Sequence, residues 1–445
     1  MFPEVSHAVG VYFFKVDRER RGVRRKASGG LHDASHPVAL QKEENMITLR
    51  ELYKIGHGPS SSHTMGPRHA AEIYLQRHPE AVAFHVTLYG SLAATGRGHR
   101  TDWAICTVLG EERTTFTWKA HVFLPFHPNG MTFCAVDVEG KEYDSWTVFS
   151  VGGGSLAEEG VQTMEYPHIY QMNHATDILH WTQQTGKTFW EYVNDCEGPD
   201  MWDYLARVWQ VMKEAVERGL EHEEAIPGGL NLRRKAASYY TKAEGYQPSM
   251  RSRGLIFAYA LAVIEENASG GLIVTAPTCG SCGVLPGVLY HIWKSRQIPE
   301  IRILRALATA GLFGNIVKHN ASISGAEVGC QGEVGVACAM AAAAASQLFG
   351  GSPAQIEYAA EMGLEHHLGL TCDPVGGLVQ IPCIERNAYA AARAMDANSF
   401  AMFSDGTHRV SFDRVIEVMK TTGHDLPSLY KETSEGGLAR NYRQM

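Results

Sequence analysis

The sequence predicts an α+β protein, with a smaller N-terminal mixed α+β domain followed by a larger, nearly all-α domain. Two observations lead to this prediction. Between residues 46 and 150, short apolar or alternating runs rich in β-branched and aromatic side chains are typical of strands. After about residue 170, apolar residues recur every three or four positions, as in helices that bury one face. We therefore expect domains at 46–170 and 171–445.

Composition limits the classes of function. Of the 445 residues, 44% are hydrophobic and 20% are charged, and the formal net charge is -8. This charge gives no support to binding of nucleic acid or of an anionic membrane surface. No apolar run approaches the roughly 18 residues that span a bilayer. Nine cysteines without a secretory signal favour a reducing cytoplasm, where cysteine clusters more often bind metal or react than form disulfides.

Residues 1–45 differ from the rest of the chain. They mix Arg, Gly, His and Ser without sustained periodicity and stop just before Met46, where an amphipathic segment, MITLRELYKI, begins. We expect a disordered extension or an over-long assignment of the start site; an arginine-rich targeting or regulatory arm is the alternative.

The smaller domain is expected to contain a helix and several strands. A polar loop, GPSSSHTMGP (residues 58–67), leads into the helix, and Pro67 suits its first turn because a missing N–H costs nothing there. The expected strands cover residues 83–91, 115–124, 131–140 and 141–155, and the last ends in glycines. These elements predict an antiparallel or mixed sheet.

Helices dominate the larger domain. The first, at 202–220, carries an apolar stripe that includes Leu205, Trp209 and Met212. Ser352 is a suitable N-cap and Pro353 a suitable first residue for another helix, and Gly350–Gly351 suit the end of the one before it. Further helices are expected at 254–267, 301–319, 336–349, 353–367, 387–398 and 412–423. Their high Ala and Gly content predicts close packing.

The polar loop at 58–67 concentrates small hydrogen-bonding side chains around His63. The hydroxyl groups suit the binding of a small anionic group such as a carboxylate, although Ser and Thr are equally common in helix-capping loops. A histidine can act as general acid or base because its usual pKa lies near neutrality. The candidate substrate-binding residues are Ser60, Ser61, Ser62 and Thr64.

Two further polar segments are candidates for the same site. TGRGHRTD (residues 95–102) places His99 where a ligand can approach its ring, with a solvated turn histidine as the alternative. KHNASISGAEVGCQGEVG (residues 318–335) brings several polar residues just before Cys330, with a simple loop between helices as the alternative. The candidates in this second segment are Asn320, Ser322, Ser324 and Glu327.

Three cysteines, Cys330, Cys372 and Cys383, follow a Gly, Thr or Pro in turn-like sequence. Backbone of this kind lets a thiolate turn toward a metal, whereas Cys338 lies in a helical apolar run and is expected in the core. The pair Cys279-x-x-Cys282 has the spacing of half a zinc site or a redox pair, but its flanking Gly and Pro residues are more typical of a loop that enters a helix.

The number of ligands narrows the choice of metal. A closed structural zinc site needs four protein ligands, whereas iron–sulfur clusters prefer cysteine thiolate. A four-iron cluster held by three cysteines leaves one iron open to water or substrate, and that iron can act as a Lewis acid. Three unrelated buried thiols are the alternative, since free cysteine is commonly buried.

Five motifs in the sequence resemble those of a known protein family. KIGHGPSSSHTMGP, TGRGHRTD, APTCGSCGVLPG, NASISGAEVGCQGEVG and LTCDPVGGLVQIPCIERNA together resemble the iron–sulfur-dependent L-serine dehydratases (L-serine ammonia-lyases) of bacteria, in the single-chain arrangement. The resemblance covers about Met46 to the C-terminus. It implies that Cys330, Cys372 and Cys383 ligate a [4Fe–4S] cluster and that the C-x-x-C pair does not.

The same resemblance implies a cytoplasmic homodimer with its active site between the two domains and the serine-rich loop closing over the cluster. In some members a C-terminal cysteine caps the open iron; this sequence ends in RNYRQM, so we expect that cap to be absent. The implied reaction is deamination of L-serine to pyruvate and ammonia, with the hydroxyl on the open iron and the α-proton removed by His63 or, as a second candidate, His99.

Three alternatives stay open. A related cluster enzyme would act on L-cysteine or another small hydroxy or amino acid. A serine-sensing module would bind the amino acid without reacting. A pyridoxal-phosphate lyase is less favoured, because no lysine stands in a recognisable Schiff-base setting.

Overall fold

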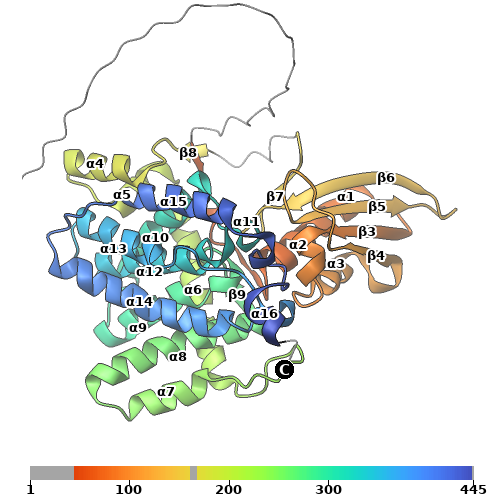
Figure 1. Cartoon of the computed structure of the whole chain (residues 1–445). Coiled ribbons are helices and arrows are strands. Elements are labelled where there is room, and N and C mark those ends of the chain that lie inside the picture. Colours follow the sequence, from red (N-terminus) through yellow and green to blue (C-terminus); the bar gives the residue numbers. More distant parts are fainter. Residues whose placement is uncertain (1–44, 161–167, 443–445) are drawn as a thin grey trace, which may run out of the picture. The chain divides into compact units, whose positions relative to one another are not determined.

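The computed structural model describes residues 45–160 and 168–442, all of them within the unit Glu43–Met445. The predicted α+β class is confirmed: a mixed sheet lies in the N-terminal part, and helices make up most of the chain after Ala175 (Figure 1). The extension predicted for residues 1–45 lies outside the described residues except for Asn45. The predicted domain boundaries, 46–170 and 171–445, stay a prediction.

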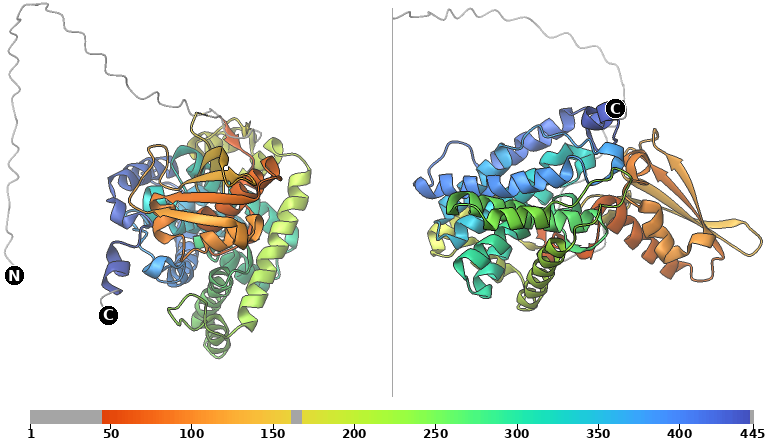
Figure 2. Two further views of the ribbon diagram at one scale, coloured as in Figure 1. Left: turned by 90° about the vertical axis from the view of Figure 1, so that its right-hand side faces the viewer. Right: turned by 90° about the horizontal axis from the view of Figure 1, so that it is seen from below.

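A five-stranded sheet forms the core of the N-terminal part, with strand order β4-β3-β5-β6-β7 (Figure 2). The strands are β3 (Ala83–Tyr89), β4 (Thr114–Lys119), β5 (Gly130–Val136), β6 (Glu142–Ser150) and β7 (Leu156–Ala157). Only β3 and β4 run parallel, and every other pair is antiparallel, so the prediction of a mixed sheet is confirmed. The strand predicted at 115–124 was too long, because β4 ends at Lys119.

Three helices pack on this sheet: α1 (Gly66–Arg77), α2 (Gly90–Thr95) and α3 (Thr101–Leu109). Helix α1 is anchored by Tyr74, whose ring stacks on Trp146 and also meets Phe133, with centroid distances of 6.0 and 5.4 Å. Such buried aromatic pairs stabilise a contact beyond the area they bury. The anchor fixes the start of α1, and with it the serine-rich loop.

The seven predicted helices of the C-terminal part are confirmed to within a few residues. The bounds are α6 (Asp200–Glu221), α8 (Pro248–Ala268), α10 (Glu300–Asn320), α12 (Val334–Leu348), α13 (Pro353–Glu365), α14 (Cys383–Phe403) and α15 (Phe412–Asp425). Ser352 caps α13 as predicted, in a capping box with Gln355. Not predicted were α4 (Ala175–Thr185), α5 (Phe189–Cys196), α7 (Ala236–Glu244), α9 (Val284–Arg296), α11 (Gly325–Val328) and α16 (Gly437–Tyr442).

Helix α12 lies at the centre of the helical part and is buried from Val334 to Ser346. Small residues on α12 and on α13 allow the two helices to approach closely. A Cβ atom added at Gly363 of α13 would lie only 2.9 Å from the backbone of Ala339 on α12. The predicted close packing is therefore confirmed. Within the described residues no single helix is long and apolar enough to cross a bilayer. One bent pair of helical segments, Gly325–Gln331 and α12, has the length and apolar composition of a membrane span only when the two segments are taken together.

The segment before the serine-rich loop belongs to the helical part by its packing. Met46, Leu49 and Tyr53 are buried in the helical core, and their segment forms β1 (Met46–Ile47) and a 3-10 turn, η1 (Leu49–Glu51). Strand β1 pairs with β8 (His168–Tyr170), and β2 (Ile55–His57) pairs with β9 (Leu272–Val274). The loop is thus held by the helical part on one side and by the sheet on the other.

Candidate active site

The serine-rich loop forms a buried π-helical turn, η2 (Ser61–Met65), that leads into α1. The Ser60 hydroxyl accepts a hydrogen bond from the His63 N–H at 3.0 Å, and the Ser60 N–H donates to Thr64 Oγ1 at 3.2 Å. These two hydroxyls therefore cap and close the turn. Ser62 differs, because its Oγ lies 2.9 Å from Nδ1 of the His63 ring. Pro67 lies in the first turn of α1 as predicted.

The structure brings the two candidate bases, His63 and His99, side by side. Their ring centroids are 4.6 Å apart and both residues are buried. His63 Nε2 lies 3.2 Å from the Ser91 carbonyl oxygen. A carbonyl only accepts, so this contact assigns the proton to Nε2 and leaves the lone pair on Nδ1. His99 is held by its backbone carbonyl, which accepts from Thr64 Oγ1 at 2.7 Å, and its Nδ1 has no hydrogen-bond partner within the described residues.

Burial governs the protonation of both rings. It lowers the pKa of His63 to about 4; the nearby His127 lowers it further, while the Ser91 carbonyl opposes the shift. Burial also lowers the pKa of His99 well below its usual range, and the His63 ring adds to this effect. Both imidazoles are therefore neutral near pH 7, which is the form in which a histidine accepts a proton.

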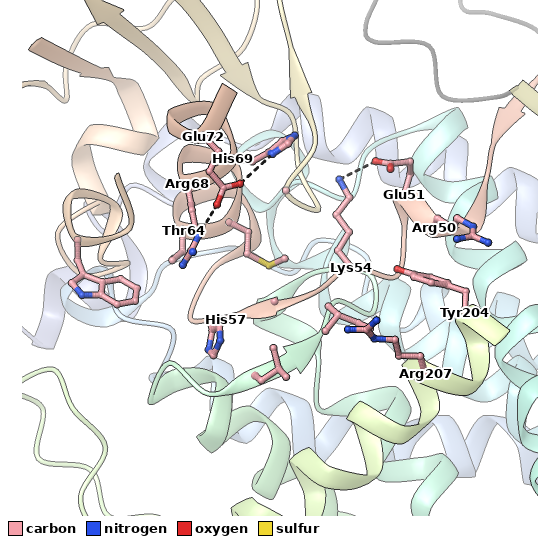
Figure 3. Close-up of a pocket in the computed structure, with 16 residues that line it drawn as sticks. Arg50, Glu51, Lys54, His57, Thr64, Arg68, His69, Glu72, Tyr204 and Arg207 are labelled. Carbon is pink, nitrogen blue, oxygen red and sulfur yellow. Dashed lines mark hydrogen bonds and ion pairs between the residues drawn. The ribbon is translucent and has the colours of Figure 1, made fainter. Parts of the chain in front are cut away.

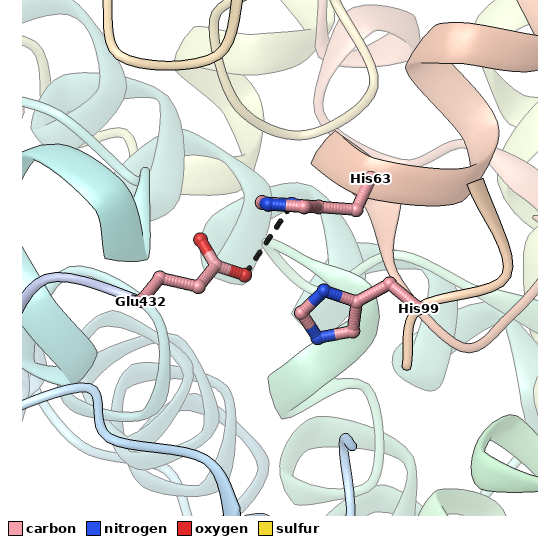
Figure 4. A group of neighbouring side chains, drawn as sticks. All are labelled: His63, His99 and Glu432. Atoms are coloured by element: carbon pink, nitrogen blue, oxygen red, sulfur yellow. Dashed lines mark ion pairs between the residues drawn. The ribbon is translucent and has the colours of Figure 1, made fainter. Parts of the chain in front are cut away.

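A third group, Glu432, completes this cluster (Figure 4). Its Oε1 lies 3.5 Å from His63 Nδ1, and the ligand atoms of His63, His99 and Glu432 all lie within 4.8 Å of one another. Burial and the neighbouring Glu333 raise the pKa of Glu432 well above its usual range. Glu432 was not predicted from the sequence, because its segment, KETSEGG, has neither periodicity nor ligand spacing.

The segment carrying Glu432 connects the histidines with the cysteines. The Glu432 N–H donates to the Cys372 carbonyl oxygen at 2.8 Å, and the Cys372 N–H donates to the Tyr430 carbonyl oxygen at 2.8 Å. From the sheet side, the Ser91 hydroxyl donates to the Glu432 carbonyl oxygen at 2.8 Å. One stretch of backbone thus contacts both the cysteine segment and the histidine pocket.

The three candidate metal ligands converge, although they come from separate elements. Cys330 lies in the 3-10 turn η5 (Gly329–Gln331), Cys372 forms an isolated β-bridge with Lys431 outside the named strands, and Cys383 is the first residue of α14. The prediction of loop backbone is therefore confirmed for Cys372 and wrong for Cys383, which begins a helix; a helix N-terminus favours a thiolate. Burial raises the pKa of the Cys372 thiol well above its usual range, and the nearby Cys330 and Cys383 thiols add to this rise, so the three thiols are neighbours.

Arg386 and Glu333 border these thiols. Burial raises the pKa of the Cys330 thiol to about 11, and the Arg386 guanidinium opposes this rise. The Arg386 side chain is itself held by a 2.8 Å hydrogen bond to the Thr371 carbonyl oxygen. Glu333 accepts from the Thr278 hydroxyl at 2.8 Å, and its Oε2 lies 3.9 Å from Cys372 Sγ. Arg386 supplies the positive charge that thiolates in a buried site require.

Comparison with known proteins identifies the family. The sequence matches the serine dehydratase alpha chain family over residues 142–439 and the serine dehydratase beta chain family over residues 48–117 and 107–161. It is 42% identical to an L-serine dehydratase of Streptomyces coelicolor, with 89% of this chain and 99% of the relative covered. The chain belongs to the serine dehydratase family. It is also 40% identical to an L-serine dehydratase of Haemophilus influenzae and 41% identical to the L-serine dehydratase TdcG of Escherichia coli, each covering 88% of this chain and 99% of the relative.

The other predicted polar residues fall into two groups: those close to the histidine cluster, and Asn320, which lies apart from it. The Ser322 hydroxyl donates to Glu327, whose carboxylate lies 3.7 Å from the buried His127 beside the histidine cluster. The Ser324 hydroxyl is buried without a partner in the described residues. Asn320, by contrast, uses its amide to bond the carbonyl oxygens of Asn173 and Ile316 and lines a different cavity with Asp413.

The remaining cysteines of the serine dehydratase fold are placed as the sequence indicated. Cys338 is buried in α12, and Cys279 begins a 3-10 turn, η4 (Cys279–Ser281), that leads into α9. Cys279 Sγ contacts the thioether of Met65 at 3.4 Å. All nine cysteines lie in the described residues, and none forms a disulfide.

Proposed function

We propose that this chain deaminates L-serine to pyruvate and ammonia, with a [4Fe–4S] cluster on Cys330, Cys372 and Cys383. The observation that carries the proposal is the stretch of backbone from Tyr430 to Glu432, which contacts the cysteine segment and places a buried carboxyl group 3.5 Å from a neutral histidine. The L-serine dehydratases named among the relatives support the choice of substrate.

The residues present fit such a cluster. Three thiols of one buried region supply the ligand type that iron–sulfur clusters prefer. Gly325 leaves space beside them, because a Cβ atom there would lie 3.2 Å from Cys372 Sγ and 2.8 Å from Glu333 Oε2. When bound, a cluster with three cysteine ligands supplies a Lewis acid that makes the substrate hydroxyl a better leaving group.

His63 is the proposed general base. Its Nε2–H donates to the Ser91 carbonyl oxygen, which fixes the ring and directs the lone pair of Nδ1 toward Ser62 and Glu432. Nδ1 takes the α-proton of L-serine. The electron pair of the Cα–H bond forms the second bond between Cα and Cβ, and the hydroxyl group leaves from Cβ. The departing hydroxide and one proton make water, so the first product is 2-aminoacrylate. This tautomerises to an imine, and hydrolysis of the imine by one water gives pyruvate and ammonia.

The other groups of the pocket orient and enclose the reactants. Glu432 keeps its carboxyl group against Nδ1, and we propose that it positions the His63 ring. Ser61, Ser62 and Ser324 are the proposed donors for the substrate carboxylate, whereas the Ser322 hydroxyl is held by Glu327. The His99 ring, beside that of His63, is proposed to form a further wall of the pocket. Holding the reacting atoms in one geometry supplies much of the rate enhancement in eliminations of this kind.

A divalent ion on His63, His99 and Glu432 is a competing hypothesis for the same pocket, because nitrogen and oxygen ligands at this spacing also suit a metal. Acid-labile sulfide distinguishes the two, since only a cluster contains it. We further propose that the enzyme is cytoplasmic and homodimeric, and takes part in the breakdown of serine toward gluconeogenesis.

The proposed function is tested by product analysis on anaerobically purified protein. L-Serine, L-threonine and L-cysteine are supplied separately, and 2-oxo acid, ammonia and sulfide are measured. We expect pyruvate and ammonia in equal amounts from L-serine at the highest kcat/KM. Faster release of sulfide from L-cysteine would indicate the related lyase, and saturable serine binding without product would indicate a sensing module.

A further inference from the structure

A second cleft, of about 750 Å³, opens beside the serine-rich loop but is lined by none of the cysteines or by His63, His99 or Glu432. Its walls come from the 50–57 segment, helix α1 and helix α6 (Figure 3). Figure 3 shows Lys54 meeting Glu51 on one side, and Glu72 between Arg68 and His69 on the other. The cleft is therefore lined by charged groups that the proposed reaction does not use.

The lining carries an excess of positive charge. Arg50, Lys54, Arg68 and Arg207 face only two carboxylates, Glu51 and Glu72, so four positive charges against two negative ones leave a net charge of two with the histidines neutral. The four cations come from three segments, which are the 50–57 segment, α1 and α6, and they line one cleft instead of one exposed helix face. A concave surface of one sign concentrates counter-ions more strongly than a flat one.

One of these cations has no partner. Arg50 is paired with Asp200 at 2.6 Å and Arg68 with Glu72 at 3.1 Å. Arg207, on α6, makes no hydrogen bond or ion pair within the described part of the chain, although its side chain lines the cleft. A guanidinium offers five donors in a planar fork that matches carboxylate and phosphate groups.

Positive charge is also crowded at one end of the cleft. Lys54 Nζ and Lys318 Nζ both donate to Ser155 Oγ, at 3.1 and 3.3 Å, and the Glu51 carboxylate lies 2.9 Å from Lys54 Nζ. Burial and the charge of Lys54 lower the pKa of Lys318 to about 7. An anion in the cleft would offset the positive charge of Lys54, which is the lysine of this pair that lines the cleft.

We propose that this cleft binds a small anion carrying at least two negative charges, either a phosphate compound or a dicarboxylate. Thr64 and Met65 form part of its wall, and both belong to the turn that carries His63. Thr64 also holds the backbone of His99 through its hydroxyl. A ligand in the cleft would therefore contact the turn that carries the proposed base, and is positioned to alter turnover.

The test measures binding directly, by calorimetry on the anaerobic full-length enzyme at constant ionic strength. The probes are inorganic pyrophosphate and succinate, with sodium chloride as the monovalent control, and iron content is measured before and after to exclude loss of metal. We expect saturable binding of at least one probe and at least a tenfold weaker Kd in the double variant Arg68→Gln/Arg207→Gln. Preference for pyrophosphate or succinate identifies which of the two chemistries the site takes.

The matched control is Arg409→Gln, which replaces another exposed arginine without an ion pair that does not line the cleft. The Arg409→Gln variant should bind the probe with the same Kd as the unaltered enzyme. The proposal is overturned if neither probe binds saturably, or if the double variant binds the probe as tightly as the control variant.

A second experiment, which rests on the proposed function, measures KM for L-serine with and without the bound probe. An unchanged KM would contradict an action of the ligand on the turn that carries His63. The calorimetric arm requires no turnover, so the two failures are distinguishable.

Discussion

His63 Nδ1 lies 3.5 Å from Glu432 Oε1, and both side chains are buried. The two residues are far apart in the sequence: His63 lies in the serine-rich loop of the N-terminal part, and Glu432 is hydrogen-bonded through its backbone to Cys372 in the helical part. This contact joins a neutral histidine to the stretch of backbone that is hydrogen-bonded to Cys372.

Replacing His63 by Gln should remove the general base while leaving the metal site intact. General base catalysis typically contributes about 10²- to 10⁴-fold, so kcat for L-serine should fall by that order. Iron content and visible absorbance should not change. His121→Gln is the control, because that side chain is 88% exposed. Loss of iron from the His63 variant, or an unchanged kcat, would contradict the assignment.

The pH dependence of kcat/KM should reflect the environment of His63. Burial lowers its pKa to about 4, so the ring stays unprotonated as the pH is lowered from 8 toward 6. The acid limb, which reports the free enzyme, should therefore have its midpoint below the usual histidine value of about 6.5. The measurement is a rate profile between pH 5 and 9 at saturating metal content. A midpoint at or above 6.5 would show that His63 is solvated or is not the base.

Glu432→Gln should slow turnover by loosening the position of His63. The amide keeps the size of the side chain, and a small misplacement of a catalytic group can cost about 10²-fold. We expect a loss of that order in kcat with little change in KM, whereas a merely structural role would lower the amount of folded enzyme and leave kcat per folded chain unchanged. Glu435→Gln, three residues further on and exposed, is the control. Equal kcat values for both variants would rule out positioning.

Gly325→Ala should interfere with loading of the cluster. The added Cβ would lie 3.2 Å from Cys372 Sγ and 2.8 Å from Glu333 Oε2, in the space beside the thiols. We expect a lower iron and sulfide content per chain and a proportional loss of activity. Gly245→Ala is the matched control, since its nearest neighbour would be 3.5 Å away. Normal iron content in the Gly325 variant would contradict the prediction that the cluster needs the space beside Cys372.

Sequence reasoning predicted the long amphipathic helices well, because α6 and α15 show the spacing of a buried stripe directly. It failed for α2 and α3, where glycines and polar residues of TGRGHRTD hide two short helices that depend on packing against the sheet. It also left the 46–57 segment unassigned, because short strands such as β2 form only through a distant partner, β9. Local periodicity carries no information about such pairings.

The candidate site shows the same limit. His63 and His99 were singled out separately, and the contact between their rings follows from the loop joining α2 to α3, which no local pattern describes. Glu432, Glu333 and Arg386 were not found, because an isolated charged residue looks the same whether it lies on the surface or next to buried thiols. Their roles are visible only from burial and from contacts between distant segments.

The central claim, that Cys330, Cys372 and Cys383 hold a [4Fe–4S] cluster required for deamination of L-serine, is tested most directly by one measurement. Iron, acid-labile sulfide and pyruvate formation are determined on anaerobically purified enzyme, before and after exposure to air, for the unaltered chain, Cys372→Ala and the buried control Cys338→Ala. We predict about four iron and four sulfide per chain, activity that falls with iron content in air, and loss of both in Cys372→Ala alone. Full activity in a colourless, iron-free preparation would contradict the account.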